Sequence, residues 1–143
     1  MANIEHLLFI QAPAAKVYEA LTTERGLAEV WTRELSVSRQ IGDTLTFRFG
    51  PDEDRMRLTE LAPDRRVVWE CVESDPQWVG TTIVFELEER SGKTSVKLGH
   101  LNWREVTPFY WSCNYNWAMF LYSLKLYVEK GKGMNYQSRV SQG

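Results

Sequence analysis

Apolar and polar residues alternate along much of the chain, and this alternation predicts a run of antiparallel strands. The alternating segments are separated by short stretches rich in Gly, Pro, Asp and Ser, which are typical of turns. On each segment one face is apolar and the other polar or charged, so the sheet must bury one face against another layer. The predicted strands are residues 43–49, 55–61, 67–73, 80–89 and 94–103.

The segment before these strands predicts one further strand and two short helices. Residues 3–11 form an apolar run rich in β-formers and are predicted as the first strand. Residues 12–23 are predicted as a helix, since Pro13 suits a first helical position. Residues 24–31 are predicted as a second short helix, with Thr22 or Thr23 as its N-cap.

Residues 107–130 are predicted as one long helix. Thr107 followed by Pro108 is a typical start, and Gly131 after Lys130 is a typical end. An apolar stripe at helical spacing faces the sheet: Trp117, Phe120, Leu121, Leu124 and Val128. Towards the N-terminus this stripe continues through Tyr110, Cys113 and Asn114, for which a core role and a cavity-wall role are both open.

A second stripe on the same helix is harder to bury, because one helix on one sheet cannot cover two faces. It consists of Trp111, Tyr115, Ala118, Met119, Tyr122 and Leu126. Either the short helices cover it or a second subunit does, and aromatic residues with Met are typical of interface cores. We therefore hypothesise a homodimer that uses Trp111, Tyr115, Met119 and Tyr122.

Composition narrows the class of protein. A chain of 143 residues suits one domain, predicted at 1–133 with a C-terminal tail at 134–143. The net charge of −2 gives no sign of nucleic-acid binding, and no apolar run approaches the ~20 residues of a membrane span. Two cysteines without metal-ligand spacing and an N-terminus unlike a signal peptide favour a cytoplasmic location.

Several short motifs resemble one superfamily in their order and spacing. They comprise Ile10, Pro13, Val17, Tyr18, Ala20, Leu21, Thr22, Leu27 and Trp31, then Thr94, Val96, Leu98 and His100, and finally Trp117, Leu121, Leu124, Gly131 and Gly133. This pattern resembles the START-like (SRPBCC, Bet v 1-like) superfamily, in the branch similar to the C-terminal domain of the activator of Hsp90 ATPase. Asn116 stands where that branch usually has Gly.

The resemblance implies an α+β helix-grip fold. In that fold a curved antiparallel β-sheet wraps around a long C-terminal helix, with two short helices after the first strand, and a cavity usually lies between them. Candidate cavity-lining residues are Trp31, Phe47, Phe49, Trp69, Trp78, Phe85, His100, Tyr110, Cys113, Asn114 and Trp117. The alternative is that these rings fill a solid core.

Few residues are candidates for catalysis or for binding a metal or cofactor. No cofactor motif or metal-ligand cluster is present, so we expect no metal and no cofactor. His100 shares a face with Val96 and Leu98 and needs a polar partner, for which Asn102, Asn114 or a ligand are candidates. His6 is interpreted as a structural strand residue, Cys113 as an inert buried thiol, and the acidic turn at 51–54 as a solvated hairpin tip.

These observations favour a non-catalytic protein that binds a small, hydrophobic or aromatic molecule in the cavity. Two alternatives remain open. One is an enzyme similar to the cyclases and dehydratases of the superfamily, with His100 or Tyr110 as acid or base. The other is an interaction protein similar to the Hsp90 ATPase activator.

Overall fold

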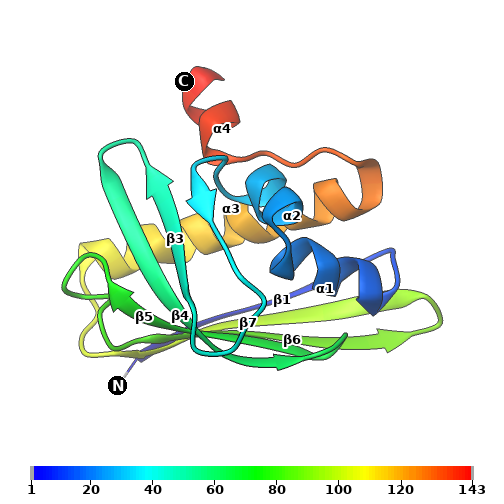
Figure 1. Ribbon diagram of the computed structural model, residues 1–143, viewed down its shortest axis with the longest axis horizontal. Coiled ribbons are helices and arrows are strands. Elements are labelled where there is room, and N and C mark those ends of the chain that lie inside the picture. Colours follow the sequence, from blue (N-terminus) through cyan, green and yellow to red (C-terminus); the bar gives the residue numbers. More distant parts are fainter. Residues whose placement is uncertain (1, 143) are drawn as a thin grey trace.

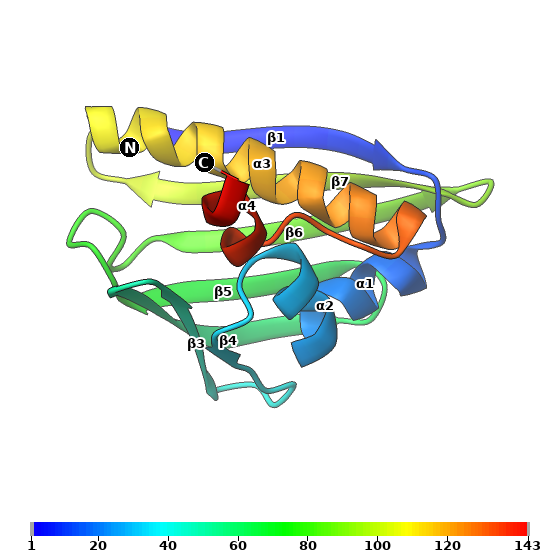
Figure 2. The same cartoon turned by 90° about the horizontal axis from the view of Figure 1, so that it is seen from above.

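A curved antiparallel sheet of seven strands forms the frame of the protein, and the computed structural model describes residues 2–142 (Figures 1 and 2). The strand order is β1-β7-β6-β5-β4-β3-β2, so β1 and β2 are the edges. The strands are β1 (Ala2–Ile10), β2 (Leu35–Ser36), β3 (Thr44–Phe49), β4 (Asp52–Ala62), β5 (Arg66–Glu73), β6 (Thr82–Arg90) and β7 (Lys93–Trp103).

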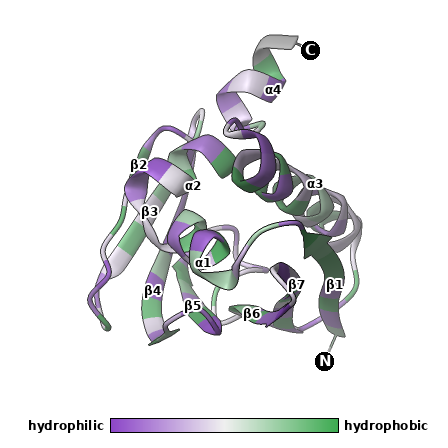
Figure 3. Ribbon diagram, turned by 90° about the vertical axis from the view of Figure 1, so that its right-hand side faces the viewer, coloured by the Kyte–Doolittle hydropathy of each residue, from purple (hydrophilic) through white to green (hydrophobic). Residues whose placement is uncertain are grey.

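Four helices accompany this sheet in the described residues: α1 (Ala14–Thr22), α2 (Glu24–Val30), α3 (Pro108–Lys130) and α4 (Tyr136–Gln142). Viewed end-on, the sheet curves from β2 on one side to β1 on the other, and α1, α2 and α3 lie on its concave side (Figure 3). The predicted α+β helix-grip architecture is therefore confirmed.

The ends of α3 follow the predicted capping signals. The Thr107 hydroxyl accepts a hydrogen bond from the Tyr110 amide at 3.3 Å, and Pro108 occupies the first turn. Gly131 ends the helix with a φ of 89°, a left-handed conformation that costs glycine little. At the start of α2, Thr23 rather than Thr22 is the N-cap, since its hydroxyl accepts from the Gly26 amide at 3.1 Å.

The structure differs from the predicted elements at β2, at α4, at the hairpin tip after β3 and near the end of β7. The edge strand β2 and the helix α4 are short and carry no strong periodic pattern, so neither was predicted. The hairpin tip after β3 is confined to Gly50 and Pro51, and residues 52–54 already belong to β4. On β7, Asn102 has a φ of 71° and the register shifts beside it, so Trp103 turns inward while Asn102 is exposed.

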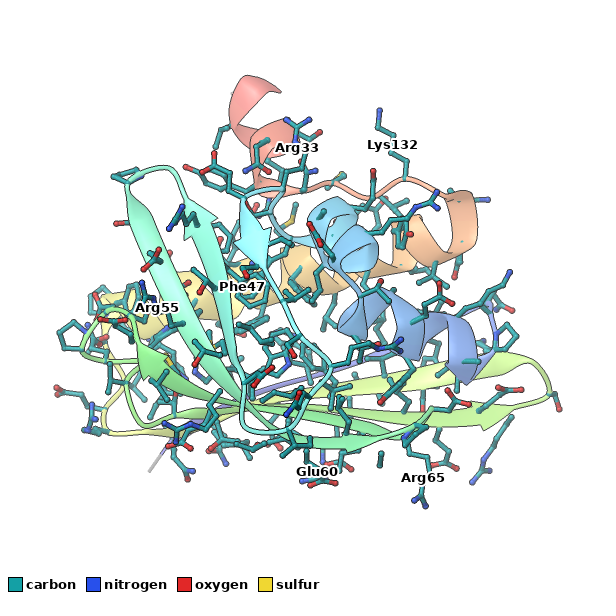
Figure 4. The ribbon with its side chains drawn as sticks, in the orientation of Figure 1. Arg33, Phe47, Arg55, Glu60, Arg65 and Lys132 are labelled. Carbon is teal, nitrogen blue, oxygen red and sulfur yellow. The ribbon has the colours of Figure 1, made fainter. Side chains whose placement is uncertain are left out.

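Aromatic rings fill the space between the sheet and α3. The ring centroids of Trp31 and Phe47 lie 4.5 Å apart, and those of Trp69 and Phe85 lie 5.2 Å apart. Phe85 also stacks on Phe120, with ring centroids 5.7 Å apart. In Figure 4, Phe47 points into this space from β3, whereas Glu60 and Arg65 project from the outer face of the sheet. Within residues 2–142, no helix combines the length and apolarity needed to cross a membrane.

Candidate ligand-binding cleft

An open cleft of about 750 Å³ lies at the end of the sheet where α3 begins. Four segments form its walls: the β3–β4 hairpin, the loop that follows β5, the N-terminal half of α3, and α4. Figures 1 and 2 agree that the first three lie together at this end of the sheet. The floor consists of Trp31, Trp78 and Trp117, each less than a tenth exposed. The volume of the cleft lies within the range of pockets that bind small molecules, about 300–1,000 Å³.

Five of the predicted cavity residues line this cleft: Trp31, Phe49, Trp78, Cys113 and Trp117. Trp78 and Trp117 stack in near-parallel planes with centroids 6.0 Å apart, and Trp31 approaches Trp117 at 5.6 Å. The three indoles therefore lie in contact beneath the opening, with only 7%, 8% and 2% of Trp31, Trp78 and Trp117 exposed. Together with the more exposed rings of Phe49 and Tyr115 they form an apolar part of the cleft that can hold a flat group by area burial and ring contact.

Three other predicted residues, Phe47, Trp69 and Phe85, lie deeper and are at most 1% exposed. Trp69 stacks on Trp31 at 6.0 Å and meets Phe47 at 5.6 Å, so ring contacts occupy their faces. None of the three is among the residues that line the cleft. For these positions the structure agrees with the solid-core alternative.

His100 is completely buried, and its two ring nitrogens are both bonded to protein groups. The Trp117 indole N–H donates to His100 Nδ1 at 2.9 Å, so this nitrogen must be an acceptor. The other nitrogen, Nε2, then carries the proton and donates to the Thr81 hydroxyl at 2.7 Å. Thr81 in turn donates to the Trp78 carbonyl at 2.5 Å. Burial lowers the pKa of His100 to about 3, which keeps the ring neutral.

His100 has protein partners, as it needs, but neither of the two asparagines named as candidates is one of them. Asn102 is turned away by the irregularity in β7, and Asn114 is exposed on α3, where its Oδ1 bonds to His6 Nε2 at 2.8 Å. The actual partner Thr81 lies in the loop before β6, and sequence periodicity does not position loop residues. Tyr110 also points elsewhere, because its hydroxyl donates to the Asn3 carbonyl at 2.6 Å. Neither His100 nor Tyr110 presents an acid or base to the cleft.

Cys113 lies on the cleft floor but is only 3% exposed. Its Sγ accepts a hydrogen bond from the Trp78 indole N–H at 3.3 Å. Burial raises the pKa of the Cys113 thiol to about 11, so the nucleophilic thiolate is scarce at neutral pH. These features agree with an inert thiol. No group of metal-binding side chains occurs among the described residues.

Acidic residues that were interpreted as a solvated hairpin tip form one wall of the cleft. Asp52, Glu53 and Asp54 from the start of β4 line it together with Asp75 from the loop after β5. The Asp54 carboxylate accepts a hydrogen bond from the Ser74 hydroxyl at 2.5 Å and is partly buried. The sequence signal was the acidic cluster itself, but only the fold places it beside the tryptophans.

The short helix α4 supplies the remaining wall through Tyr136, Arg139 and Val140. Its start is tied to the end of α2, since the Tyr136 amide donates to the Trp31 carbonyl at 2.6 Å. The Asn135 side chain also donates to the Ala28 carbonyl at 3.0 Å. The Tyr136 ring meets Phe49 edge to face at 5.5 Å, which joins α4 to the β3–β4 hairpin.

A family model and several solved structures are similar to this chain. The family model described as Activator of Hsp90 ATPase homolog 1-like protein matches residues 11–129. The Aha1 dimer from Colwellia psychrerythraea is 42% identical, with a TM-score of 0.87, over 93% of this chain and 100% of that chain. Protein SSP2350 from Staphylococcus saprophyticus is 18% identical, with a TM-score of 0.77, over 92% of this chain and 95% of that chain.

A further structural neighbour is DynU16, a protein in the dynemicin biosynthetic locus. It is 21% identical, with a TM-score of 0.78, over 92% of this chain and 48% of that chain. At this low identity it indicates a shared fold, as does SSP2350. The comparison with curated proteins gave no match.

Proposed function

The chain belongs to the Activator of Hsp90 ATPase homolog 1-like family, and we propose that it holds a small, largely apolar molecule in the cleft without transforming it. The observation that carries this proposal is the opening of about 750 Å³ with three contacting indoles, Trp31, Trp78 and Trp117, at its base. A flat ring held in this opening would gain area burial and ring contacts that water cannot supply.

The proposal that the ligand is not transformed is based on His100 and Tyr110, the two residues best suited to act as acid or base. A general base must reach the proton it removes, directly or through one water. His100 uses both nitrogens inside the core, and the Tyr110 hydroxyl is bonded outside the cleft. A cyclase-like or dehydratase-like reaction would therefore need a different acid or base.

The first test uses the indole N–H signals in two-dimensional ¹H–¹⁵N NMR spectra, assigned through single Trp→Phe variants. We expect neutral 2-(2-naphthyl)ethanol to shift the signals of Trp31, Trp78 and Trp117. The signals of Trp69 and Trp103 should stay in place, because both lie outside the cleft lining. Unchanged spectra at millimolar probe would contradict the proposal.

A cleft-filling variant supplies the control. Asn116 lines the cleft from α3 and is exposed, so Asn116→Trp should occupy the opening without disturbing the core. We expect it to weaken probe binding by about tenfold or more, since it removes a buried ring contact worth about 1.5 kcal/mol. Glu105→Trp adds the same ring at an exposed position outside the cleft lining and should leave affinity unchanged.

A homodimer is a second proposal, carried by the uncovered flank of α3. Trp111, Tyr115 and Tyr122 are 62%, 66% and 49% exposed, so the short helices do not cover them. Met119 lies beside them on the same flank and is partly buried. Exposed rings in one row favour a protein partner. A second copy is the occupant we propose, because the Colwellia relative is described as a dimer.

Light scattering tests the homodimer directly. We expect a mass of twice 16.7 kDa at micromolar protein, and Tyr122→Glu should return it to 16.7 kDa by placing a charge in the apolar contact. Gln40→Glu adds the same charge at an exposed position in the loop between β2 and β3, away from α3, and should remain dimeric. A wild-type mass of one chain would refute the dimer.

The family description also leaves open a role as an activator of Hsp90 ATPase. Stimulated ATPase turnover on adding this protein would support that role. Loss of stimulation in Trp111→Ala but not in Asn116→Trp would place it on the outer flank rather than in the cleft. For location, we propose the cytoplasm, because Cys71 and Cys113 are both free thiols.

A further inference from the structure

Resting on the binding function proposed above, we infer that the cleft selects an organic cation: a flat apolar body that carries a positively charged nitrogen. The inference comes from the charges around the indole floor. Four carboxyl groups line the cleft, from Asp52, Glu53, Asp54 and Asp75, against a single cationic side chain, Arg139.

Three of these carboxylates have no cationic partner in the described residues. Glu53 is neutralised, since it accepts from Arg48 Nε at 2.8 Å and from Arg55 Nε at 2.9 Å. Asp54 is bonded to the neutral Ser74 hydroxyl, and Asp75 accepts from the Gln77 amide at 2.9 Å. For Asp52 no ion pair is present among the described side chains. The wall therefore keeps uncompensated negative charge close to an apolar floor.

The carboxylates also repel one another. Burial raises the pKa of Asp54 above its ordinary value, and Asp52, Asp75 and Glu53 raise it further, against the Ser74 hydrogen bond that lowers it. Negative charges that face each other across low-dielectric walls concentrate counter-ions between them. A cation bound there would relieve this repulsion, whereas an anion would add to it.

The aromatic floor also favours a cation over a neutral or anionic group. The faces of indole rings carry negative electrostatic potential, so a cation that reaches the exposed part of Trp31 or Trp78 gains cation–π attraction in addition to that of the carboxylates. A neutral ring gains only stacking and area burial. The apolar body and the charged nitrogen of one ligand would thus be held by different parts of the same cleft.

Arg139 is the one lining group that opposes a cation. It stands on α4, is partly buried, and has no ion-pair partner among the described residues. Burial lowers the pKa of its guanidinium, which indicates that its charge is poorly solvated. Because a single group carries this opposing charge, the sign of the selectivity can be tested by substitution at that position.

The experiment compares three probes that share one body, by calorimetry on the full chain at low salt. They are 2-(2-naphthyl)ethyltrimethylammonium, neutral 2-(2-naphthyl)ethanol and anionic 3-(2-naphthyl)propanoate. We expect the cation to bind about tenfold tighter than the neutral probe and the anion weakest. Added salt should weaken the cation but not the neutral probe, because only the cation depends on charge attraction.

Substitutions that remove single charges show which residues cause the preference for a cation. The double variant Asp52→Asn with Asp75→Asn should lower the ratio of cation affinity to neutral-probe affinity about tenfold, because it removes two charges while both exposed side chains keep their shape. Arg139→Gln should raise cation affinity. Glu105→Gln removes an exposed acid outside the cleft lining and should change neither.

The possible results distinguish the selection of a cation from the binding function on which that selection rests. Equal affinity for the cation and the neutral probe would overturn charge selection and leave the binding function standing. Tighter binding of the anion, or weaker cation binding in Arg139→Gln, would also overturn it. If none of the three probes binds, both proposals fail.

Discussion

Between pH 6.5 and pH 3 the free energy of unfolding is expected to fall by about 4 kcal/mol because of one side chain, His100. Its pKa is about 3 in the folded protein, against 6.5 when unperturbed. In this window the unfolded chain binds a proton that the folded chain excludes, so stability falls as the pH falls. Only well above pH 6.5 do both states carry neutral His100, and there its full contribution is present.

The physical cause is the closed set of hydrogen bonds around the ring. Nδ1 already accepts from the Trp117 indole, so a proton there would face another N–H donor. Trp78, Trp103 and Trp117 surround the imidazole, with centroids 4.8, 4.9 and 5.7 Å away. A charged ring could be solvated only by opening this cluster.

The measurement is chemical denaturation from pH 7 to pH 4.5, compared with His100→Gln. Glutamine can accept from Trp117 and donate to Thr81 but does not titrate in this range. The wild type should lose roughly 3 kcal/mol over this interval and the variant much less. The comparison stops at pH 4.5 because Glu53 and Glu129, whose pKa values lie below normal, add acid sensitivity further down. Equal slopes would remove His100 as the cause.

The sequence predicted the frame of this protein well because local patterns determine it. Strand alternation identified the buried faces, as in Val67, Trp69 and Cys71 of β5. Capping residues marked both ends of α3, since Thr107 and Gly131 act through backbone groups within a few residues of themselves. These signals need no knowledge of distant parts of the chain.

The cleft was only partly predictable, because its walls come from segments far apart in the sequence. Periodicity places Trp117 on the inner face of α3, but it cannot tell whether rings from other segments cover it. Phe85 and Trp78 carried the same aromatic signal, yet one lies in the core and the other on the cleft floor. Arg139 carried no signal at all, because α4 gains its position from hydrogen bonds to the end of α2.

Gly26→Ala is expected to destabilise the protein by about 3 kcal/mol and to lower the melting temperature by roughly 10 °C. A β-carbon at Gly26 would lie 2.3 Å from the Ala20 carbonyl oxygen and 2.6 Å from the Ala20 α-carbon. Both atoms belong to the backbone of α1, so no side-chain rotation can relieve the contact. The helix α2 would have to move away from α1.

Any loss of stability in Gly26→Ala can be assigned to the contact with the Ala20 backbone, because the other effects of alanine favour folding. Alanine has the higher helix propensity, worth up to about 1 kcal/mol, and Gly26 lies within α2. Gly99→Ala in β7 is the matched control: its β-carbon would lie 2.9 Å from Leu101 Cδ2, the end of a flexible side chain. Calorimetric melting should therefore show a large loss for Gly26→Ala and a small change for Gly99→Ala. Similar melting temperatures for both variants would mean that α1 and α2 can separate at little cost. Because α2 also anchors α4 through the Ala28 carbonyl, that result would make the α4 wall of the cleft adjustable as well.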